Sequence, residues 1–237
     1  MLLPQWERAM PKNRSRSGIK NSVLSRLSRA DFALLKPHLE AVDLPVLTQL
    51  ETGNERIDDV YFMERGFASV VADGSGMRGI EVGLIGREGM TGLAVVMGND
   101  RSPHDTYIQA AGAGQRIGVA KLRRAMNRSV PLQRSLMLYA HAFLIQTAQT
   151  ALANGRSKNA ERLARWLLMA DDRIDGRELP LTHKFLSIML GVQRPGVTLA
   201  VQALEHEGLI GARRGIISIV DRKGLEKMSN GAYLPAE

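Results

Sequence analysis

Residues 181–220 decide the fold of the C-terminal third of this chain, and they read LTHKFLSIMLGVQRPGVTLAVQALEHEGLIGARRGIISIV. Thr182 precedes an apolar, helix-periodic run, where its hydroxyl oxygen can accept from the free amides of a helix start. Gly191 is placed to end this first helix, because glycine tolerates a positive φ. Pro195 falls in the first turn of a second helix, where a missing N–H has no cost, and Gly208 closes that helix. Two helices joined by a tight glycine turn predict a helix-turn-helix.

A short hairpin is expected after the second helix. Residues 209–210 and 216–220 supply its strands, with Arg213 and Arg214 at its tip, and together they predict a two-stranded wing. The plain alternative is a pair of helices packed inside a larger core. A nucleic-acid partner is favoured because the outward positions of the second helix are polar or basic with no acidic residue among them: Gln193, Arg194, Thr198 and Gln202.

The segment from Thr182 to Asp221 resembles the DNA-binding half of the Crp/Fnr family of bacterial transcription regulators. The residues that carry this resemblance are LTHKFLSIMLGVQRPGV, LEHEGLI and RGIISIVDRKGLE, and a weaker likeness extends over nearly the whole chain. The resemblance implies an α+β fold with an N-terminal double-stranded β-roll (jelly-roll-like), a long dimerisation helix and a C-terminal winged helix-turn-helix. It also implies three partners: double-stranded DNA, a second copy of the chain as a homodimer, and RNA polymerase.

The family pattern also assigns roles along the second helix. Arg194 falls on a base-contacting arginine, and arginine suits the O6 and N7 atoms of guanine. Pro195 and Leu199 replace a glutamate and an arginine of that pattern, so we expect an operator unlike that of cyclic-AMP-responsive members. The residues expected to contact DNA are Thr182, Lys184, Gln193, Arg194, Thr198, Leu199, Gln202, Arg213 and Arg214. Within this set, Thr182, Lys184 and the two wing arginines are expected at phosphates, although the arginines of the wing also fit plain solvated turn residues.

Composition limits the remaining classes. The chain has 237 residues, 44% hydrophobic and 24% charged, which is typical of a soluble protein with room for two domains. It contains no cysteine, so disulfides and thiolate metal sites are excluded. No apolar run approaches the ~20 residues that a membrane-spanning helix needs, and no signal peptide opens the chain, so a cytoplasmic protein is expected.

The net charge of +8 lies at the two ends of the chain. Residues 1–30 carry a net +6, residues 31–153 a net −1 and residues 154–237 a net +3. Basic ends around a neutral centre suit a protein that binds a polyanion. Residues 1–21 are interpreted as a flexible basic arm, either without a role or adding phosphate contacts.

Short apolar runs separated by glycine-rich turns follow from Val42 to Val119, and they predict a β-barrel or sandwich. In this interpretation 112–115 (GAGQ) is a hairpin turn. The tract VYFMERGFASVV (60–71) is similar to the strand-Gly-strand signature of the family's cyclic-nucleotide-binding domain. GREGMTGLAVVMG (86–98) takes the place of its phosphate-binding cassette.

The cassette departs from the cyclic AMP pattern. Cyclic AMP requires backbone amides and an arginine for the phosphate, and a carboxylate for the ribose. Leu93 replaces the expected glutamate, and His104 and Asp105 fall where an arginine-serine pair is expected. Cyclic AMP is therefore not expected as effector. A lost ligand, an unrelated effector and constitutive activity all fit the sequence, and no cofactor is predicted. The residues of the candidate effector pocket are Gly89, Met90, Thr91, Gly92, Leu93, Arg101, Ser102 and His104.

Enzymatic and metal chemistry find no support in the sequence. The five histidines show no paired ligand spacing, and Asp171, Asp172 and Asp175 lack the spacing of a calcium loop. No Ser/His/Asp order, nucleotide-binding loop or dinucleotide fingerprint is present. Neither a metal site nor a catalytic residue is predicted.

A nearly charge-free helix is expected from residue 132 to residue 152. A surface helix would carry charges on its outer face, so this helix predicts the seam of a homodimer, with burial in a single core as the alternative. The seam residues are Leu136, Ala140, Phe143, Leu144, Ala148 and Leu152. The predicted division is an arm (1–21), a β-roll sensor domain (22–127), a dimerisation helix (128–154) and a winged helix-turn-helix domain (155–237).

Two functions are consistent with these observations. The first is a homodimeric, sequence-specific transcription regulator acting on a pseudo-palindromic operator. The second is a sensor or interaction protein whose basic end binds RNA or a protein.

Overall fold

The computed structural model describes residues 18–72, 79–176 and 178–235. Most of the predicted N-terminal arm, residues 1–17, lies outside the described residues. The chain divides into two units, the first made of residues 1–69 and 85–146 and the second of residues 70–84 and 147–237. The second unit is therefore built from two separate stretches of sequence.

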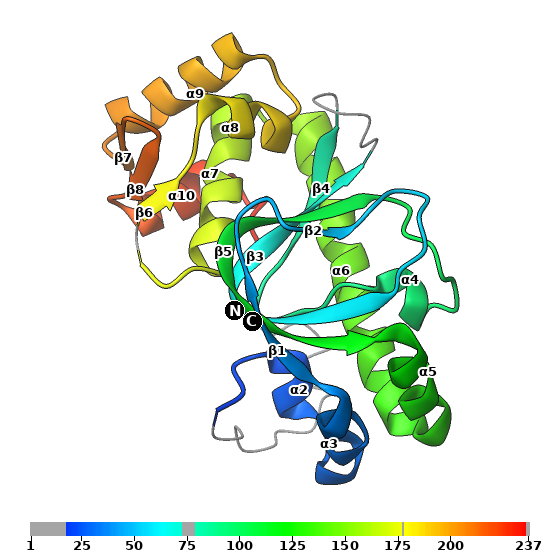
Figure 1. Ribbon diagram of the computed structural model, residues 1–237. Coiled ribbons are helices and arrows are strands. Elements are labelled where there is room, and N and C mark those ends of the chain that lie inside the picture. The colour runs from blue at the N-terminus through cyan, green and yellow to red at the C-terminus, as the bar shows by residue number, and fades with distance from the viewer. Residues whose placement is uncertain (1–17, 73–78, 177, 236–237) are drawn as a thin grey trace. The chain divides into compact units, whose positions relative to one another are not determined.

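Antiparallel strands form most of the first unit (Figure 1). They run in the order β1-β5-β3-β4, with β2 also paired to β5. The strands are β1 (Glu40–Leu44), β2 (Gln49–Glu51), β3 (Asp59–Ala72), β4 (Ile80–Ile85) and β5 (Asp105–Gly118). The end of β3 and nearly all of β4 belong to the second unit.

The predicted hairpin turn at residues 112–115 is wrong. These residues lie inside β5 and pair with β1, Gly112 opposite Leu44 and Gly114 opposite Val42. Glycine is required here for close approach of two backbones, since a Cβ on Gly112 would lie 1.9 Å from the carbonyl oxygen of Arg65. A glycine-rich stretch in this sheet therefore marks crowding between strands and not a reversal of the chain.

Short helices precede and follow the strands of the first unit. They are α2 (Ser22–Arg26), α3 (Arg29–Leu35), the 3₁₀ turn η1 (Lys36–His38), α4 (Leu93–Val96) and α5 (Val119–Arg128). Ser28 caps α3, and its hydroxyl oxygen accepts from the Asp31 amide at 3.0 Å. The core of this unit joins α2, β3, the cassette and α5, with Leu24, Phe62, Met90 and Leu122 fully buried.

The long helix α6 (Val130–Arg156) is continuous, as the sequence predicts, but its apolar residues face two ways. Leu136, Ala140 and Phe143 are buried within the single chain, at 9% exposure or less. They are already covered and so do not form a free seam, which corrects the prediction for these three. Leu144 and Leu152 are 63% and 48% exposed, and Ala148 is exposed with them.

The second unit contains the predicted helix-turn-helix and a three-stranded sheet. Its elements after α6 are α7 (Asn159–Asp171), β6 (Glu178–Pro180), α8 (His183–Leu190), α9 (Arg194–His206), β7 (Ile210–Arg213), β8 (Ile216–Ile219) and α10 (Arg222–Met228). The sheet order is β6-β8-β7, so the predicted two-stranded wing gains a third strand from the segment before α8. Helix α7 packs against α8, α9 and α10 and forms the support of this unit.

Candidate nucleic-acid interface

Helix α8 begins and ends at the predicted residues. The Thr182 hydroxyl oxygen accepts from the Phe185 amide at 3.2 Å, and Gly191 ends the helix at φ 58°. A Cβ on Gly191 would lie 2.5 Å from Cδ1 of Ile80, so the Ile80 side chain would have to shift. The turn between α8 and α9 therefore favours glycine chiefly through its positive φ.

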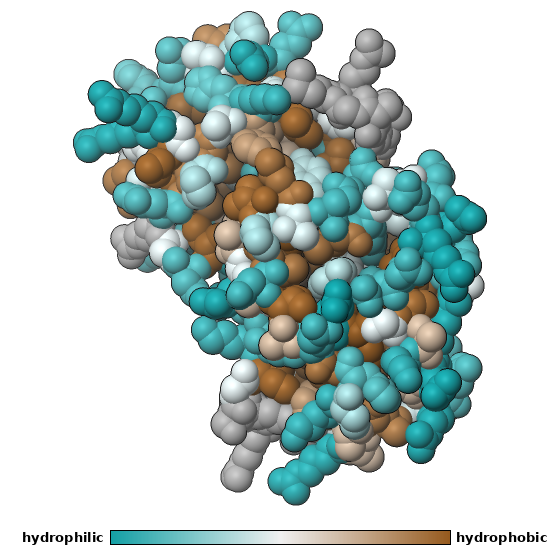
Figure 2. Space-filling view, viewed as in Figure 1, coloured by the Kyte–Doolittle hydropathy of each residue, from teal (hydrophilic) through white to brown (hydrophobic). Residues whose placement is uncertain are grey.

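Helix α9 presents one buried and one exposed face. Its inner face is buried through Val197, Ala200, Val201 and Leu204. Arg194 and Pro195 occupy its first two positions, as predicted. The exposed residues on and just before α9 include Gln193, Arg194, Leu199 and Gln202. In Figure 2, hydrophilic side chains cover much of the region where Figure 1 places α9 and the wing.

Thr198 and Leu199 complete the outward surface of α9. Leu199 is 68% exposed. The Thr198 hydroxyl donates to the Arg194 carbonyl at 3.1 Å and lies 3.3 Å from Nδ1 of His183. His183 belongs to α8, so this contact connects the two helices of the motif. No sequence signal singled out His183.

The wing closes with a tight turn between β7 and β8. Arg213 pairs with Ile216, and the two residues between them, Arg214 and Gly215, both have positive φ, at 44° and 84°. Such turns suit the twist of a hairpin, and they leave both arginines exposed at the tip. The wing is attached to α9 by Glu205, whose Oε1 accepts from the Ala212 amide at 2.9 Å.

A groove lies between α9 and the wing. Its wall includes Leu181, His183, Thr198, Gln202, Glu205, Arg213 and Arg214, from α8, α9, the wing and the residues before α8. Six predicted DNA contacts therefore lie on α9 or beside this groove: Arg194, Thr198, Leu199, Gln202, Arg213 and Arg214. Glu205 is the acidic member, and its bond to the wing backbone explains its presence on a face predicted to meet phosphates.

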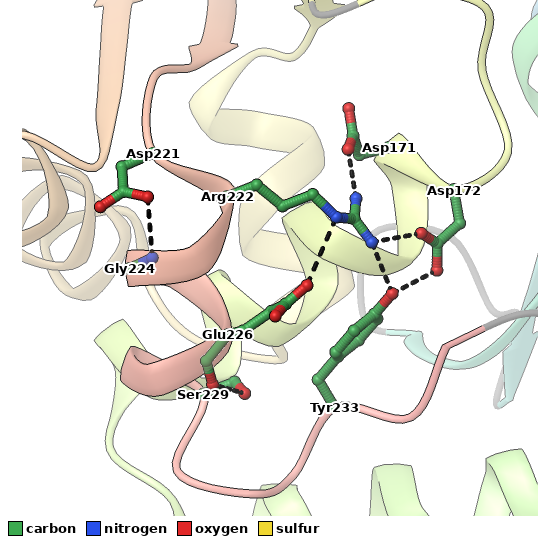
Figure 3. Close-up of polar contacts among 8 residues, drawn as sticks. All are labelled: Asp171, Asp172, Asp221, Arg222, Gly224, Glu226, Ser229 and Tyr233. Atoms are coloured by element: carbon green, nitrogen blue, oxygen red, sulfur yellow. Dashed lines mark hydrogen bonds and ion pairs between the residues drawn. The ribbon is translucent and has the colours of Figure 1, made fainter. Parts of the chain in front are cut away.

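An arginine of α10 fixes the support behind the interface (Figure 3). Arg222 pairs with Asp171 and, at 2.6 Å, with Asp172 at the end of α7. The Tyr233 hydroxyl lies 2.7 Å from both Asp172 and Arg222. Burial and the hydrogen bond to Asp172 raise the pKa of Tyr233. The two aspartates that loosely resembled a calcium loop thus serve as partners of Arg222.

The predicted effector residues surround the start of α4 and the segment before β5. Gly89 packs on Tyr139, Met90 and Thr91 are buried, and Gly92 has φ 75° directly before Leu93, the first residue of α4. Arg101 is exposed, and its guanidinium donates to the carbonyl of Asn54 at 2.7 Å. Ser102 is buried, and His104 is partly buried. The sequence interpretation missed Glu51, which bonds to Gly92 and Ser102, and Thr106, which bonds to Glu51.

The geometry defines a class of protein: a winged helix-turn-helix unit joined by a long helix to a β-roll of the cyclic-nucleotide-binding type. Residues 161–228 match the Crp-like helix-turn-helix domain. This match identifies the C-terminal part of the chain as a helix-turn-helix domain of the kind found in Crp/Fnr transcription regulators. No curated protein matches it in sequence.

Solved structures with the same fold cover nearly the whole chain. A crp/fnr-family transcriptional regulator from Eubacterium rectale is 19% identical, with a TM-score of 0.70, and the match covers 89% of this chain and 98% of that one. FixK2 from Bradyrhizobium japonicum is 17% identical, with a TM-score of 0.67 and coverage of 80% and 96%. CLP of Xanthomonas campestris, described as a c-di-GMP-responsive global regulator, is 15% identical, with a TM-score of 0.65 and coverage of 81% and 99%.

The described residues contain neither a candidate membrane-spanning helix nor a cluster of metal ligands. None of the helices in ranges 18–72, 79–176 and 178–235 is long and apolar enough to cross a membrane. Within the same ranges, no three histidine or carboxylate side chains gather as metal ligands would.

Proposed function

We propose that this regulator binds, as a homodimer, a pseudo-palindromic DNA operator and reads it with α9. The observation that carries the proposal is the division of α9 into a fully packed inner face and an exposed outer face that begins with Arg194. Residues at the start of a recognition helix are those that reach base edges in the major groove. Arg194 is the guanine-reading residue, and the Leu199 side chain is placed to meet a thymine methyl group.

In the proposal, residues on either side of α9 contact DNA phosphates. Lys184 is exposed on the first turn of α8, and Arg213 and Arg214 are exposed at the wing tip. Contacts of this kind set register and supply salt-dependent affinity without sequence information. The groove between α9 and the wing separates the two kinds of contact.

The dimer is formed in this proposal by the exposed apolar residues of α6. Met137, Leu144 and Leu152 are 42%, 63% and 48% exposed along the helix, and Ala148 lies between the two leucines. The spacings of seven, four and four residues place all four on one stripe, as in a helix pair. One recognition helix touches too few bases to select a site in a genome, so a second copy is required for specificity.

The β-roll acts in this proposal without cyclic AMP. Leu93 stands where a carboxylate would bind the ribose, and the guanidinium of Arg101 is engaged by the Asn54 carbonyl. The absence of a carboxylate at Leu93 and the bond from Arg101 to Asn54 support this part of the proposal, because cyclic AMP needs partners for its ribose and its phosphate.

The test is selection of bound sites from random duplex DNA by the full-length protein. The expected result is an inverted repeat with half-sites one helical turn, about 34 Å, apart. Single-stranded RNA of matched length is titrated in parallel at several salt concentrations. Tighter binding of RNA than of duplex, or selected sites without two-fold symmetry, would contradict the proposal.

A further inference from the structure

Glu51, the last residue of β2, directs its carboxylate at the residues predicted to form the effector pocket. Its Oε1 accepts from the amide of Gly92 at 2.5 Å. Its Oε2 lies 3.0 Å from the Ser102 hydroxyl and 3.1 Å from the Thr106 hydroxyl. Both hydroxyl residues are deeply buried, at 2% and 1% exposure. A carboxylate is thus surrounded by the kind of donors that bind an anion.

The donors differ in how fully they are committed to Glu51. The Gly92 amide and the Thr106 hydroxyl each have the Glu51 carboxylate as acceptor. A serine hydroxyl has one proton, and that of Ser102 is shared, because the carbonyl of His104 lies 2.7 Å from the same oxygen. Hydrogen bonds to an ionised acceptor are shorter and stronger than neutral ones, in keeping with the short bond from Gly92.

The residues after Glu51 are hydrogen-bonded to the segment around Ser102. The Asn54 amide donates to the Ser102 carbonyl at 2.7 Å, and the Ser102 amide donates to the Glu55 carbonyl at 3.0 Å. The Gly53 amide donates to Oδ1 of Asp105 at 2.8 Å. The segment 51–55 is therefore joined, by backbone and side chain, to the segment that was expected to receive a phosphate.

We propose that the Glu51 carboxylate occupies the place of a bound anion beside the cassette. It accepts the hydrogen bonds that a phosphate-bearing effector would require. It closes this pocket to cyclic nucleotides and holds β2, the start of α4 and β5 in one arrangement without an effector. The inference rests on the proposed function only in taking the β-roll as the sensor. Removal of the carboxylate should then leave a vacant site for a small carboxylate from solution.

The experiment compares Glu51→Ala with the matched control Glu55→Ala in the full-length protein. Glu55 is exposed in the same segment, and its part in the pairing is made by its backbone. Glu51→Ala is expected to lower the melting temperature by about 3–10 °C, because it leaves buried donors unpaired. Sodium formate or acetate should restore most of this loss, and sodium chloride at equal ionic strength should not.

Several results would overturn the assignment. One is a Glu51→Ala protein with the same melting temperature as the wild type. Another is formate raising the melting temperature of the Glu55→Ala control as much as that of Glu51→Ala. If Glu51→Ala does not fold, Glu51→Gln is measured instead. Its amide group retains the shape but has no charge, and its NH2 faces the Ser102 and Thr106 hydroxyls, which would have to turn from donors into acceptors. It should therefore melt below wild type and stay unresponsive to formate. A Glu51→Gln protein that melts with the wild type would overturn the assignment equally.

One further measurement uses only the wild-type protein. Cyclic AMP and cyclic di-GMP at 1 mM are expected to leave its melting temperature unchanged, and stabilisation by either would overturn the closure of the pocket. Duplex binding is measured on the same samples. Absence of duplex binding by the wild type would refute the proposed reading of DNA by α9 and leave the assignment of Glu51 intact. Nucleotide binding would overturn the assignment of Glu51 and leave the proposed reading of DNA intact.

Discussion

Nε1 of Trp166 donates a hydrogen bond of 2.6 Å to Oε1 of Glu81, and both residues are buried. Glu81 belongs to β4 and Trp166 to α7, so the end of the β3–β4 pair is attached to the helix that supports the interface. Arg165, the neighbour of Trp166, is also buried. Burial lowers the pKa of Arg165, while the charge of Glu81 opposes that change. Glu81 thus accepts from the indole N–H and its charge favours the buried cation of Arg165.

Removal of this carboxylate should destabilise the second unit. Glu81→Ala is expected to lower the free energy of unfolding by about 3–5 kcal/mol, because a buried cation loses its counter-charge. Glu81→Gln retains an acceptor for the indole and should lose less. Urea unfolding followed by Trp166 fluorescence, in a Trp6→Phe background, measures both. The exposed Glu207→Ala is the control, and equal stability of all three proteins would show that Glu81 has no such role.

Base reading by Arg194 is tested by Arg194→Ala. Specific affinity should fall by roughly 1–3 kcal/mol, and preference at one guanine per half-site should relax. Competition among operator variants measures both effects. A mutant that keeps the full wild-type base preference would place the reading residue elsewhere on the interface.

Phosphate contacts predict a different pattern for Lys184→Ala and Arg213→Ala. Each should weaken binding to all duplexes alike and reduce the slope of log affinity against log salt by about one unit per lost contact. Titrations at four salt concentrations on operator and random DNA give the slope. If Arg213→Ala changes base preference instead, the wing reads a groove.

The dimer prediction now depends on Leu144 and not on Phe143. A charge at the buried Phe143 would unfold the chain, whereas Leu144 is 63% exposed in the single chain. Leu144→Glu should therefore dissociate the dimer and abolish operator binding without loss of helicity. Light scattering and circular dichroism check this, with the 75% exposed Val130→Glu on the same helix as control. A wild type that is monomeric at micromolar concentration would contradict the assignment.

The Arg222 cluster predicts a pH dependence. The pKa of Tyr233 is raised from 10.0 by burial and by Asp172, so above pH 10 the folded chain holds a proton that the unfolded chain has lost. Stability is therefore favoured below pH 10 and falls as pH rises beyond it. The fall in unfolding free energy between pH 9 and 11 should be smaller in Tyr233→Phe than in the wild type. Identical slopes in the two proteins would show that Tyr233 does not contribute.

Local signals in the sequence located the helix-turn-helix correctly. Thr182, Gly191 and Pro195 act through their own backbone or the next turn, so their roles are readable without neighbours. Gly112 and Gly114 led to the wrong prediction of a turn. Glycine is needed at both positions because β3, more than forty residues away in sequence, passes close to their backbone. Glu51 and Glu81 were missed for the same reason, since their partners are distant in sequence and ordinary in type. On α6, periodicity identified an apolar helix. It could not show which apolar residues are buried within the single chain and which stay exposed for a second copy.

The second unit is assembled from two separate stretches of sequence, and this matters for any attempt to express it alone. A fragment beginning at residue 147 would contain α8, α9 and the wing but would lack residues 70–84. Trp166 would lose its acceptor, Arg165 its counter-charge, and the glycine turn its packing on Ile80. Such a fragment would retain every residue proposed to touch DNA and yet be a less stable reader. An excised DNA-binding unit of this protein should therefore include residues 70–84, for instance by fusing them to its N-terminus through a flexible linker.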